Sequence, residues 1–220
     1  MKHGETVINI KELDFSYPYG KKVFEGLTFS LKKGETVGLT GSNGAGKTTL
    51  FHLIMGLLKH DAGEIEIFEK ARKVEKDFIE VRRRIGLVFQ DSDDQLFCPT
   101  VEEDIAFGPL NLGKSQEEAK AVVGEVCEKL GLKGFERKVT HRLSGGEKRL
   151  VALATAAAMN PECFLFDEPV VGLDEATTDR FLKYLKEYGN TYIIITHDQE
   201  FLRSAADKVY ILKDSKIIPR

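Results

Sequence analysis

Residues 41–48 have the types and spacing that suit phosphate binding. The segment Gly41-Ser-Asn-Gly-Ala-Gly-Lys-Thr48 fits the pattern G-x-x-x-x-G-K-[ST], after the apolar stretch Glu35–Thr40 and before helical spacing over Lys47–Leu58. Glycines let successive backbone N–H groups turn toward phosphate oxygens, and the N-terminus of the next helix adds positive charge. Lys47 would reach the β- and γ-phosphates, and Thr48 would offer its hydroxyl to Mg²⁺. The complete pattern predicts a nucleoside triphosphate site rather than a turn that only caps a helix.

A second anion-binding signal is Leu143-Ser-Gly-Gly-Glu147. Ser144 and Glu147 have the spacing of a capping box, so an ordinary helix start is one interpretation of the segment. A helix start that combines a serine hydroxyl with two glycines without side chains is also an anion site. The two interpretations are compatible, and we expect both to hold.

With these two motifs the sequence resembles the ATP-binding cassette family, and the resemblance covers nearly the whole chain. It implies an α/β fold: a P-loop NTPase core with a mostly parallel sheet, an N-terminal antiparallel β-subdomain and an inserted α-helical lobe. It implies one nucleotide-binding domain over residues 1–220, with the lobe at roughly 91–160, and ATP and Mg²⁺ as cofactors. The implied nucleotide contacts are Ser42, Asn43, Gly44, Ala45, Gly46, Lys47, Thr48 and Thr49 of one copy, and Ser144, Gly145, Gly146 and Glu147 of another.

Two acids follow the apolar segment Cys163–Phe166, and with it they resemble the Walker B motif of the family. An apolar strand that ends in two acids holds them rigidly at the carboxyl edge of a sheet, where α/β proteins bind ligands. By the resemblance, Asp167 holds Mg²⁺ through water, and Glu168 polarises the attacking water as the general base. An exposed acidic turn is the default interpretation of an isolated Asp-Glu pair, but it is a poor one for these two acids.

Four further residues receive roles through the same resemblance. His197 resembles the switch histidine that contacts the γ-phosphate, and Gln90 resembles the glutamine that touches Mg²⁺ and the attacking water beside the membrane partner. Asp174 resembles the loop that crosses the dimer interface, although it also suits the N-cap of the next helix. Tyr17 resembles the aromatic residue that stacks on adenine; the alternative is a turn tyrosine that packs on its own hairpin.

The segments Phe89–Phe97 and Pro99–Pro109 resemble ATPases of energy-coupling-factor importers, which take up vitamins or metal ions such as cobalt and nickel. A solvated acidic loop is the alternative for the first of them. Many ATPases of that type continue past the core, whereas this sequence ends at Arg220.

The resemblance also implies the partners and the location. It implies a second cassette ATPase subunit, identical or different, and integral membrane transporter subunits. It implies no contact with the transported solute and none with nucleic acid, and it places the chain as a peripheral protein on the cytoplasmic face of the cell membrane.

Hydrophobic periodicity distributes these motifs over alternating strands and helices. Strands are expected at Val7–Phe15, Lys21–Leu31, Glu35–Thr40, Glu64–Phe68, Ile85–Phe89, Cys163–Phe166, Thr191–Ile195, Lys208–Leu212 and Lys216–Ile218. Helices are expected at Lys47–Leu58, Val74–Arg83, Glu175–Tyr188 and Asp198–Ala206, and two more begin after the capping boxes at Thr100 and Ser115. Apolar strands that alternate with helices predict a parallel sheet covered on both faces.

The composition limits the classes of protein to which the sequence could belong. With 42% apolar and 30% charged residues, a formal charge of -3 and three scattered cysteines, the chain resembles an ordinary globular protein of a reducing compartment. Residues 1–15 have no long apolar segment, so no signal peptide is expected. The alternatives are a cassette ATPase acting on nucleic acid or ribosomes, or a nucleotide-gated module without turnover. The chain leaves no room for the long coiled coils or the second cassette of the former, and Glu168 argues against the latter.

Overall fold

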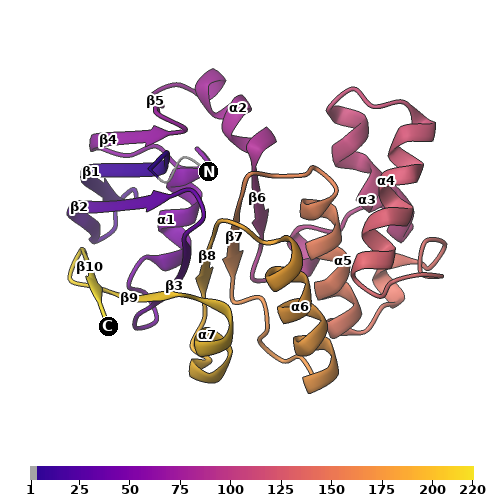
Figure 1. Cartoon of the computed structure of the whole chain (residues 1–220). Coiled ribbons are helices and arrows are strands. Elements are labelled where there is room, and N and C mark those ends of the chain that lie inside the picture. Colours follow the sequence, from indigo (N-terminus) through magenta and orange to yellow (C-terminus); the bar gives the residue numbers. More distant parts are fainter. Residues whose placement is uncertain (1–3) are drawn as a thin grey trace.

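The computed structural model describes residues 4–220 (Figure 1). Residues 1–3, the start of the segment for which no signal peptide is expected, lie outside the described residues. The strands are β1 (Thr6–Ser16), β2 (Lys22–Lys32), β3 (Thr36–Thr40), β4 (Ala62–Ile67), β5 (Lys70–Ala71), β6 (Ile85–Val88), β7 (Cys163–Asp167), β8 (Tyr192–Ile195), β9 (Lys208–Lys213) and β10 (Lys216–Pro219). The helices are α1 (Lys47–Ile54), α2 (Glu75–Arg84), α3 (Val101–Asn111), α4 (Gln116–Lys129), α5 (Gly145–Ala157), α6 (Glu175–Tyr188) and α7 (Gln199–Ala205), with two 3₁₀ turns at Ser92–Asp94 and Thr140–Arg142.

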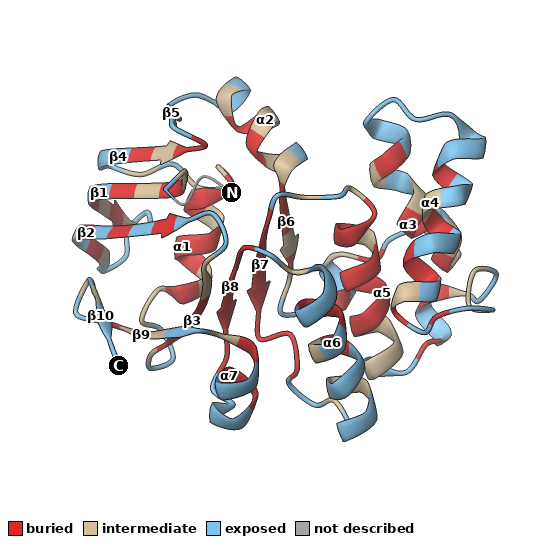
Figure 2. Cartoon of the chain, viewed as in Figure 1, coloured by how far each residue is buried: buried red, intermediate tan, exposed pale blue. Residues whose placement is uncertain are grey.

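The central sheet has six strands in the order β10-β9-β3-β8-β7-β6. Its pairs are parallel except β10 with β9, which closes one edge as a hairpin. Side chains of β7 alternate between two hydrophobic cores. Leu165 packs with α1 and the antiparallel sheet on one face, while Phe166 packs with α5 and α6 on the other. The strand is therefore buried on both sides, as parallel strands usually are (Figure 2).

A second, antiparallel sheet in the order β2-β1-β4-β5 lies beside α1. Register shifts interrupt the pairing of β1 with β2, and they curve the ribbon over the helix. Inward-facing residues such as Ile8, Ile10 and Leu27 are fully buried with Leu50 and Leu53 of α1. This sheet therefore supports the helix that begins at the phosphate-binding loop.

Helices α3, α4 and α5 gather at the opposite end of the molecule, to the right in Figure 1. Each begins with a capping box, in which the side chains of Thr100, Ser115 and Ser144 accept from the third residue of their helices. The predicted fold class is confirmed: a mostly parallel core sheet, an N-terminal antiparallel sheet and a helical segment between the two halves of the core.

The structure corrects some boundaries. Helix α1 ends at Ile54 rather than Leu58, because Gly56 has a φ of 68°, the left-handed conformation in which many helices end. A side chain at this position would collide with Phe78. The two-residue strand β5 was not expected. Within residues 4–220, none of the helices has the length and apolar character needed to cross a membrane.

Candidate active site

The loop of residues 41–46 connects β3 to α1, and glycine is sterically required in it. Gly46 has a φ of 100°, and a Cβ there would approach Val23 and Phe24 to 2.7–2.8 Å. Gly41 would likewise bring a Cβ to 2.6 Å from the Leu212 carbonyl oxygen. The loop can therefore lie closely against β2 and β9 while its backbone N–H groups and the N-terminus of α1 face the same pocket.

Lys47, the first residue of α1, turns back across this loop. Its Nζ donates to the carbonyl oxygens of Gly41 at 2.8 Å and Ser42 at 3.1 Å. Burial lowers the pKa of Lys47 from its ordinary value, while the charges of Glu168 and Asp167 oppose that shift. The ammonium group is thus held at the mouth of the loop, between the backbone and two carboxylates.

Asp167 and Glu168 lie at the carboxyl end of β7. Both are buried, and the Asp167 Oδ1 and Glu168 Oε2 atoms have no hydrogen-bond partner among the described residues. Glu168 has a φ of 46°, and its N–H donates to the Ile195 carbonyl oxygen at 2.8 Å. A non-glycine residue in this left-handed region is unfavourable by about 1 kcal/mol or more and persists only where the surroundings impose it. Strand β8 imposes it here and directs the Glu168 side chain into the pocket.

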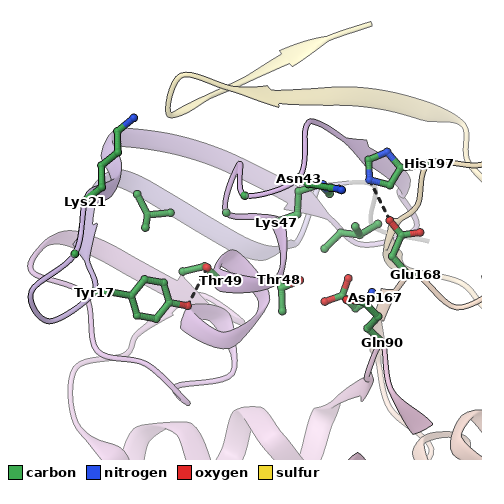
Figure 3. Close-up of a pocket in the computed structure, with 15 residues that line it drawn as sticks. Tyr17, Lys21, Asn43, Lys47, Thr48, Thr49, Gln90, Asp167, Glu168 and His197 are labelled. Atoms are coloured by element: carbon green, nitrogen blue, oxygen red, sulfur yellow. Dashed lines mark hydrogen bonds and ion pairs between the residues drawn. The ribbon is translucent and has the colours of Figure 1, made fainter.

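The two acids have different surroundings. Burial raises the pKa of Asp167; the neighbouring Thr48 hydroxyl opposes the shift, and the charge of Glu168 adds to it. Glu168 instead has His197 beside it, with 3.4 Å between His197 Nε2 and Glu168 Oε1 (Figure 3). His197 follows β8, so the pairing depends on β7 and β8 being neighbours.

Tyr17 lies at the other end of the pocket, in the turn between β1 and β2. Its hydroxyl is 3.1 Å from Thr49 Oγ1, and its ring meets Phe15 edge to face with 5.0 Å between centroids. Tyr17 therefore both packs on its own hairpin and lines the pocket (Figure 3). The residue is 41% exposed, so its ring can still stack on a ligand.

Together these elements enclose a pocket of about 600 Å³. Of the predicted residues, those that line it are Tyr17, Asn43, Gly44, Gly46, Lys47, Thr48, Thr49, Gln90, Asp167, Glu168 and His197. Gly20, Lys21, Val23 and Ile195 also line it and were missed by sequence reasoning. The only signal for Lys21 was its position just after the turn that contains Tyr17.

The remaining predicted contacts lie elsewhere. Ser42 and Ala45 belong to the loop but do not line the pocket. Ser144, Gly145, Gly146 and Glu147 form the exposed or half-exposed start of α5, where Glu147 Oε2 accepts from the Ser144 N–H at 2.7 Å. This hydrogen bond is the largest of the causes that lower the pKa of Glu147. Asp174 caps α6 by accepting from the Thr177 N–H at 2.7 Å. None of these five residues lines the pocket that holds Lys47.

The pocket contains a donor set that fits Mg²⁺. Thr48 and Asp167 face each other in Figure 3, with Gln90 beside them. The free Asp167 Oδ1 is a buried oxygen that needs a partner, and hydroxyl, carboxylate and amide oxygens are the ligands that Mg²⁺ takes from proteins. Residues 4–220 contain no cluster of three or more His, Cys, Asp or Glu side chains able to hold a metal by themselves. The site therefore suits an ion that is held partly by substrate phosphates.

A glycine loop that holds a lysine, two buried acids at a strand end and a histidine opposite them define a P-loop nucleotide hydrolase. The model of the ABC transporter family matches residues 24–171. The chain belongs to this family, and it is an ATPase subunit.

Several relatives are similar over most of their length. The energy-coupling factor transporter ATP-binding protein EcfA of Methanocaldococcus jannaschii is 47% identical, over 96% of this chain and 77% of its own. A putative ABC transporter ATP-binding protein of Nitratidesulfovibrio vulgaris is 46% identical, over 90% of this chain and 73% of its own.

Two solved structures share the fold. The cbiO1 protein of Clostridium perfringens, part of the ABC transporter complex cbiONQ, has a TM-score of 0.86 at 34% identity, covering 98% of this chain and 88% of its own. A dimeric ATP-binding cassette in a post-hydrolysis state, bound to ADP and Pi, has a TM-score of 0.85 at 27% identity, covering 96% of both chains.

Proposed function

We propose that this chain is the ATP-hydrolysing subunit of an energy-coupling-factor importer, which takes up a vitamin or a transition-metal ion. The observation that carries the hydrolysis is the buried Glu168 carboxylate, which has one free oxygen and lies beside His197 in the pocket of Lys47. The likeness to EcfA and to a subunit of cbiONQ supports the importer.

In this proposal the residues that line the pocket have different roles. Tyr17 stacks on adenine, while Lys47 and the N–H groups of the loop neutralise the phosphates. Glu168 accepts the proton of the attacking water through its free oxygen, and the neighbouring His197 contacts the γ-phosphate. Little covalent chemistry falls to the protein, so catalysis rests on positioning and charge neutralisation.

Mg²⁺ would be held by Thr48, by Asp167 through water and by Gln90. When bound, it would supply positive charge that offsets the negative charge developing on the phosphates. Gln90 also orients the attacking water, and the buried Asp167 keeps a negative charge near the hydroxyl of Thr48.

The site is completed by a second copy or a related subunit. Ser144, Gly145, Gly146 and Glu147 lie outside the pocket of their own chain, so we assign them to the ATP of the partner. Asp174, at the start of α6, crosses the same interface. Two ATP molecules then hold the two domains together, and hydrolysis lets them separate.

For the domain organisation, we propose one nucleotide-binding domain over residues 1–220 with the helical lobe inserted at roughly 91–160.

The chain would be peripheral, on the cytoplasmic face of the cell membrane, against integral membrane subunits. Exposed apolar side chains close to the Gln90 loop support that contact. Phe97 and Phe107 are 66% and 48% exposed, and their rings meet at 4.8 Å. The transported solute would bind those subunits and not this chain.

The test is a pull-down of the tagged chain from detergent-solubilised native membranes with Mg-ATP, followed by mass spectrometry. Recovery of a multi-span membrane protein, with or without a second cassette ATPase, supports the importer, and its solute-binding component names the cargo. Recovery of only DNA, ribosomes or soluble proteins contradicts the transport role and leaves the ATPase chemistry standing.

A further inference from the structure

Arg149, in the second turn of α5, is a buried cation that the mechanism above does not use. Only 9% of it is exposed, and its Nη1 donates to the carbonyl oxygens of Phe89 at 3.0 Å and Gln90 at 2.5 Å. Its Nε has no hydrogen-bond partner among the described residues. Arg149 also lines a cavity of about 720 Å³ together with Gln90, Thr48 and Asp167. These three residues line the nucleotide pocket as well, whereas Arg149 does not.

The backbone of Gln90 has few other supports. It follows the last residue of β6, Val88, by two positions, and it therefore lies beyond the sheet ladder. The Gln95 side chain accepts from the Phe89 N–H at 3.1 Å and donates to the Ala152 carbonyl oxygen and the Thr155 hydroxyl, both at 2.7 Å. These bonds tie the loop to α5 on the side of Phe89. At Gln90 itself, the bond to α5 comes from Arg149.

Satisfying two carbonyl oxygens does not require a charged residue. Burying a guanidinium is unfavourable unless nearby negative charges compensate it. Burial does lower the pKa of Arg149, and the charges of Asp91, Asp167 and Glu168 oppose that shift. Two of these three acids are the buried carboxylates of the active site. The arginine is thus placed where it can both hold the Gln90 backbone and balance the charge of the catalytic acids.

We infer that Arg149 is a positioning residue that holds Gln90 in place beside Thr48 and Asp167 and ties it to α5. Ser144, which we assign to the ATP of the partner, is the N-cap of helix α5. Because a helix moves as a rigid element, a shift of its N-terminus on engaging that ATP is passed through Arg149 to Gln90 in the pocket of its own chain. The inference rests on the proposed role of Gln90 in hydrolysis.

The test is a double-mutant cycle on the 220-residue chain that combines Arg149→Met with Gln90→Ala. Arg149→Met removes the charge and both hydrogen bonds but keeps an apolar side chain of similar length. We expect kcat for ATP to fall by about 10- to 100-fold, the scale for a misplaced catalytic group, with KM within about twofold. The double variant should be no slower than Gln90→Ala alone, because both changes remove the same contribution.

Lys148→Met is the matched control. Lys148 is the neighbouring cation on α5, and its Nζ pairs with Asp93 Oδ1 at 2.5 Å. The hydrogen bonds to the Phe89 and Gln90 carbonyl oxygens come from Arg149 and not from Lys148. Asp93 is largely exposed, so this ion pair contributes little, and kcat should stay within about twofold of the unmodified chain. The melting temperature and the affinity for a fluorescent ATP analogue report on folding for every variant. If Arg149→Met does not fold, Arg149→Lys replaces it in the same cycle.

The outcomes separate the two ideas. Normal kcat in Arg149→Met, or a loss that adds in full to that of Gln90→Ala, overturns the positioning role while the role of Gln90 stands. Normal turnover in Gln90→Ala itself overturns the proposed role of Gln90, and with it this inference. A slow, non-additive Arg149→Met with unchanged KM supports both.

Discussion

Changing Glu168 to Gln removes one negative charge from the nucleotide pocket while keeping the size and shape of the side chain. In the structure, Glu168 Oε1 lies 3.4 Å from His197 Nε2, and Oε2 is buried without a partner. An amide can still accept a hydrogen bond from the histidine, but it cannot accept a proton from water. The variant should therefore bind ATP and fail to hydrolyse it.

The expected changes in kcat, ATP affinity and stability follow from these contacts. General base catalysis contributes about 10²- to 10⁴-fold, so kcat should fall by that factor, equivalent to about 2.7–5.5 kcal/mol on the barrier. The dissociation constant for ATP should stay within about threefold, because Lys47, the loop and Tyr17 are untouched. The free energy of unfolding should change by less than about 1 kcal/mol, which corresponds to a shift of no more than about 4 °C in melting temperature.

The assay is phosphate release at saturating Mg-ATP, with nucleotide binding and thermal unfolding measured on the same samples. Glu69→Gln is the matched control, since Glu69 is also a glutamate with positive φ, 60°, but is exposed and does not line the pocket. Size-exclusion chromatography with ATP should show the Glu168→Gln variant accumulating as a dimer, because hydrolysis no longer separates the two copies.

Two results would refute this reasoning. Hydrolysis by Glu168→Gln at the rate of the Glu69→Gln control would show that another group activates the water. A loss of ATP binding of tenfold or more would show that Glu168 supports the ground state and not the hydrolytic step.

Three further predictions concern other parts of the chain. Tyr17→Ala should weaken ATP binding by up to about tenfold because stacking on adenine is lost, whereas Tyr17→Phe should keep the affinity of the unmodified chain. If Tyr17→Ala binds ATP as tightly as the unmodified chain in a titration, Tyr17 is not part of the adenine site. Gly56→Ala should lower stability by at least about 2 kcal/mol in urea unfolding, since its Cβ would meet Phe78 at 2.2 Å with φ at 68°, and an unchanged midpoint would contradict this. A hydrogen bond from Arg72 is the largest cause that lowers the pKa of Glu80 to about 2. The stability that Glu80 contributes is thus present above its unfolded pKa near 4.5 and is lost as pH falls toward 2. The difference in unfolding free energy between the unmodified chain and Glu80→Gln should therefore shrink as pH falls from 4.5 to 2. A difference that stays constant over this range would contradict the prediction.

The local features of this protein were readable from the sequence because short spacings specify them. The glycine pattern of residues 41–46 requires a tight loop before a helix, and the serine and threonine caps with a glutamate three residues later determine where α3, α4 and α5 begin. Hydrophobic runs predicted nearly every strand within two residues. The resemblance to a known family then connected Glu168, His197 and Gln90 with hydrolysis, a link that periodicity alone does not contain.

The tertiary structure decided which distant residues meet. The order β10-β9-β3-β8-β7-β6 makes β7 a neighbour of β8. This neighbourhood brings His197 to Glu168 and lets the Glu168 N–H donate to the Ile195 carbonyl oxygen. The same holds for Tyr17 and Thr49, which come from the turn between β1 and β2 and from α1. Arg149 had no local signal, because a lone arginine in a helix is ordinarily a solvated side chain. Its burial follows from the packing of α5 against the loop after β6, and such non-local packing depends on the whole fold rather than on the spacing of neighbouring residues.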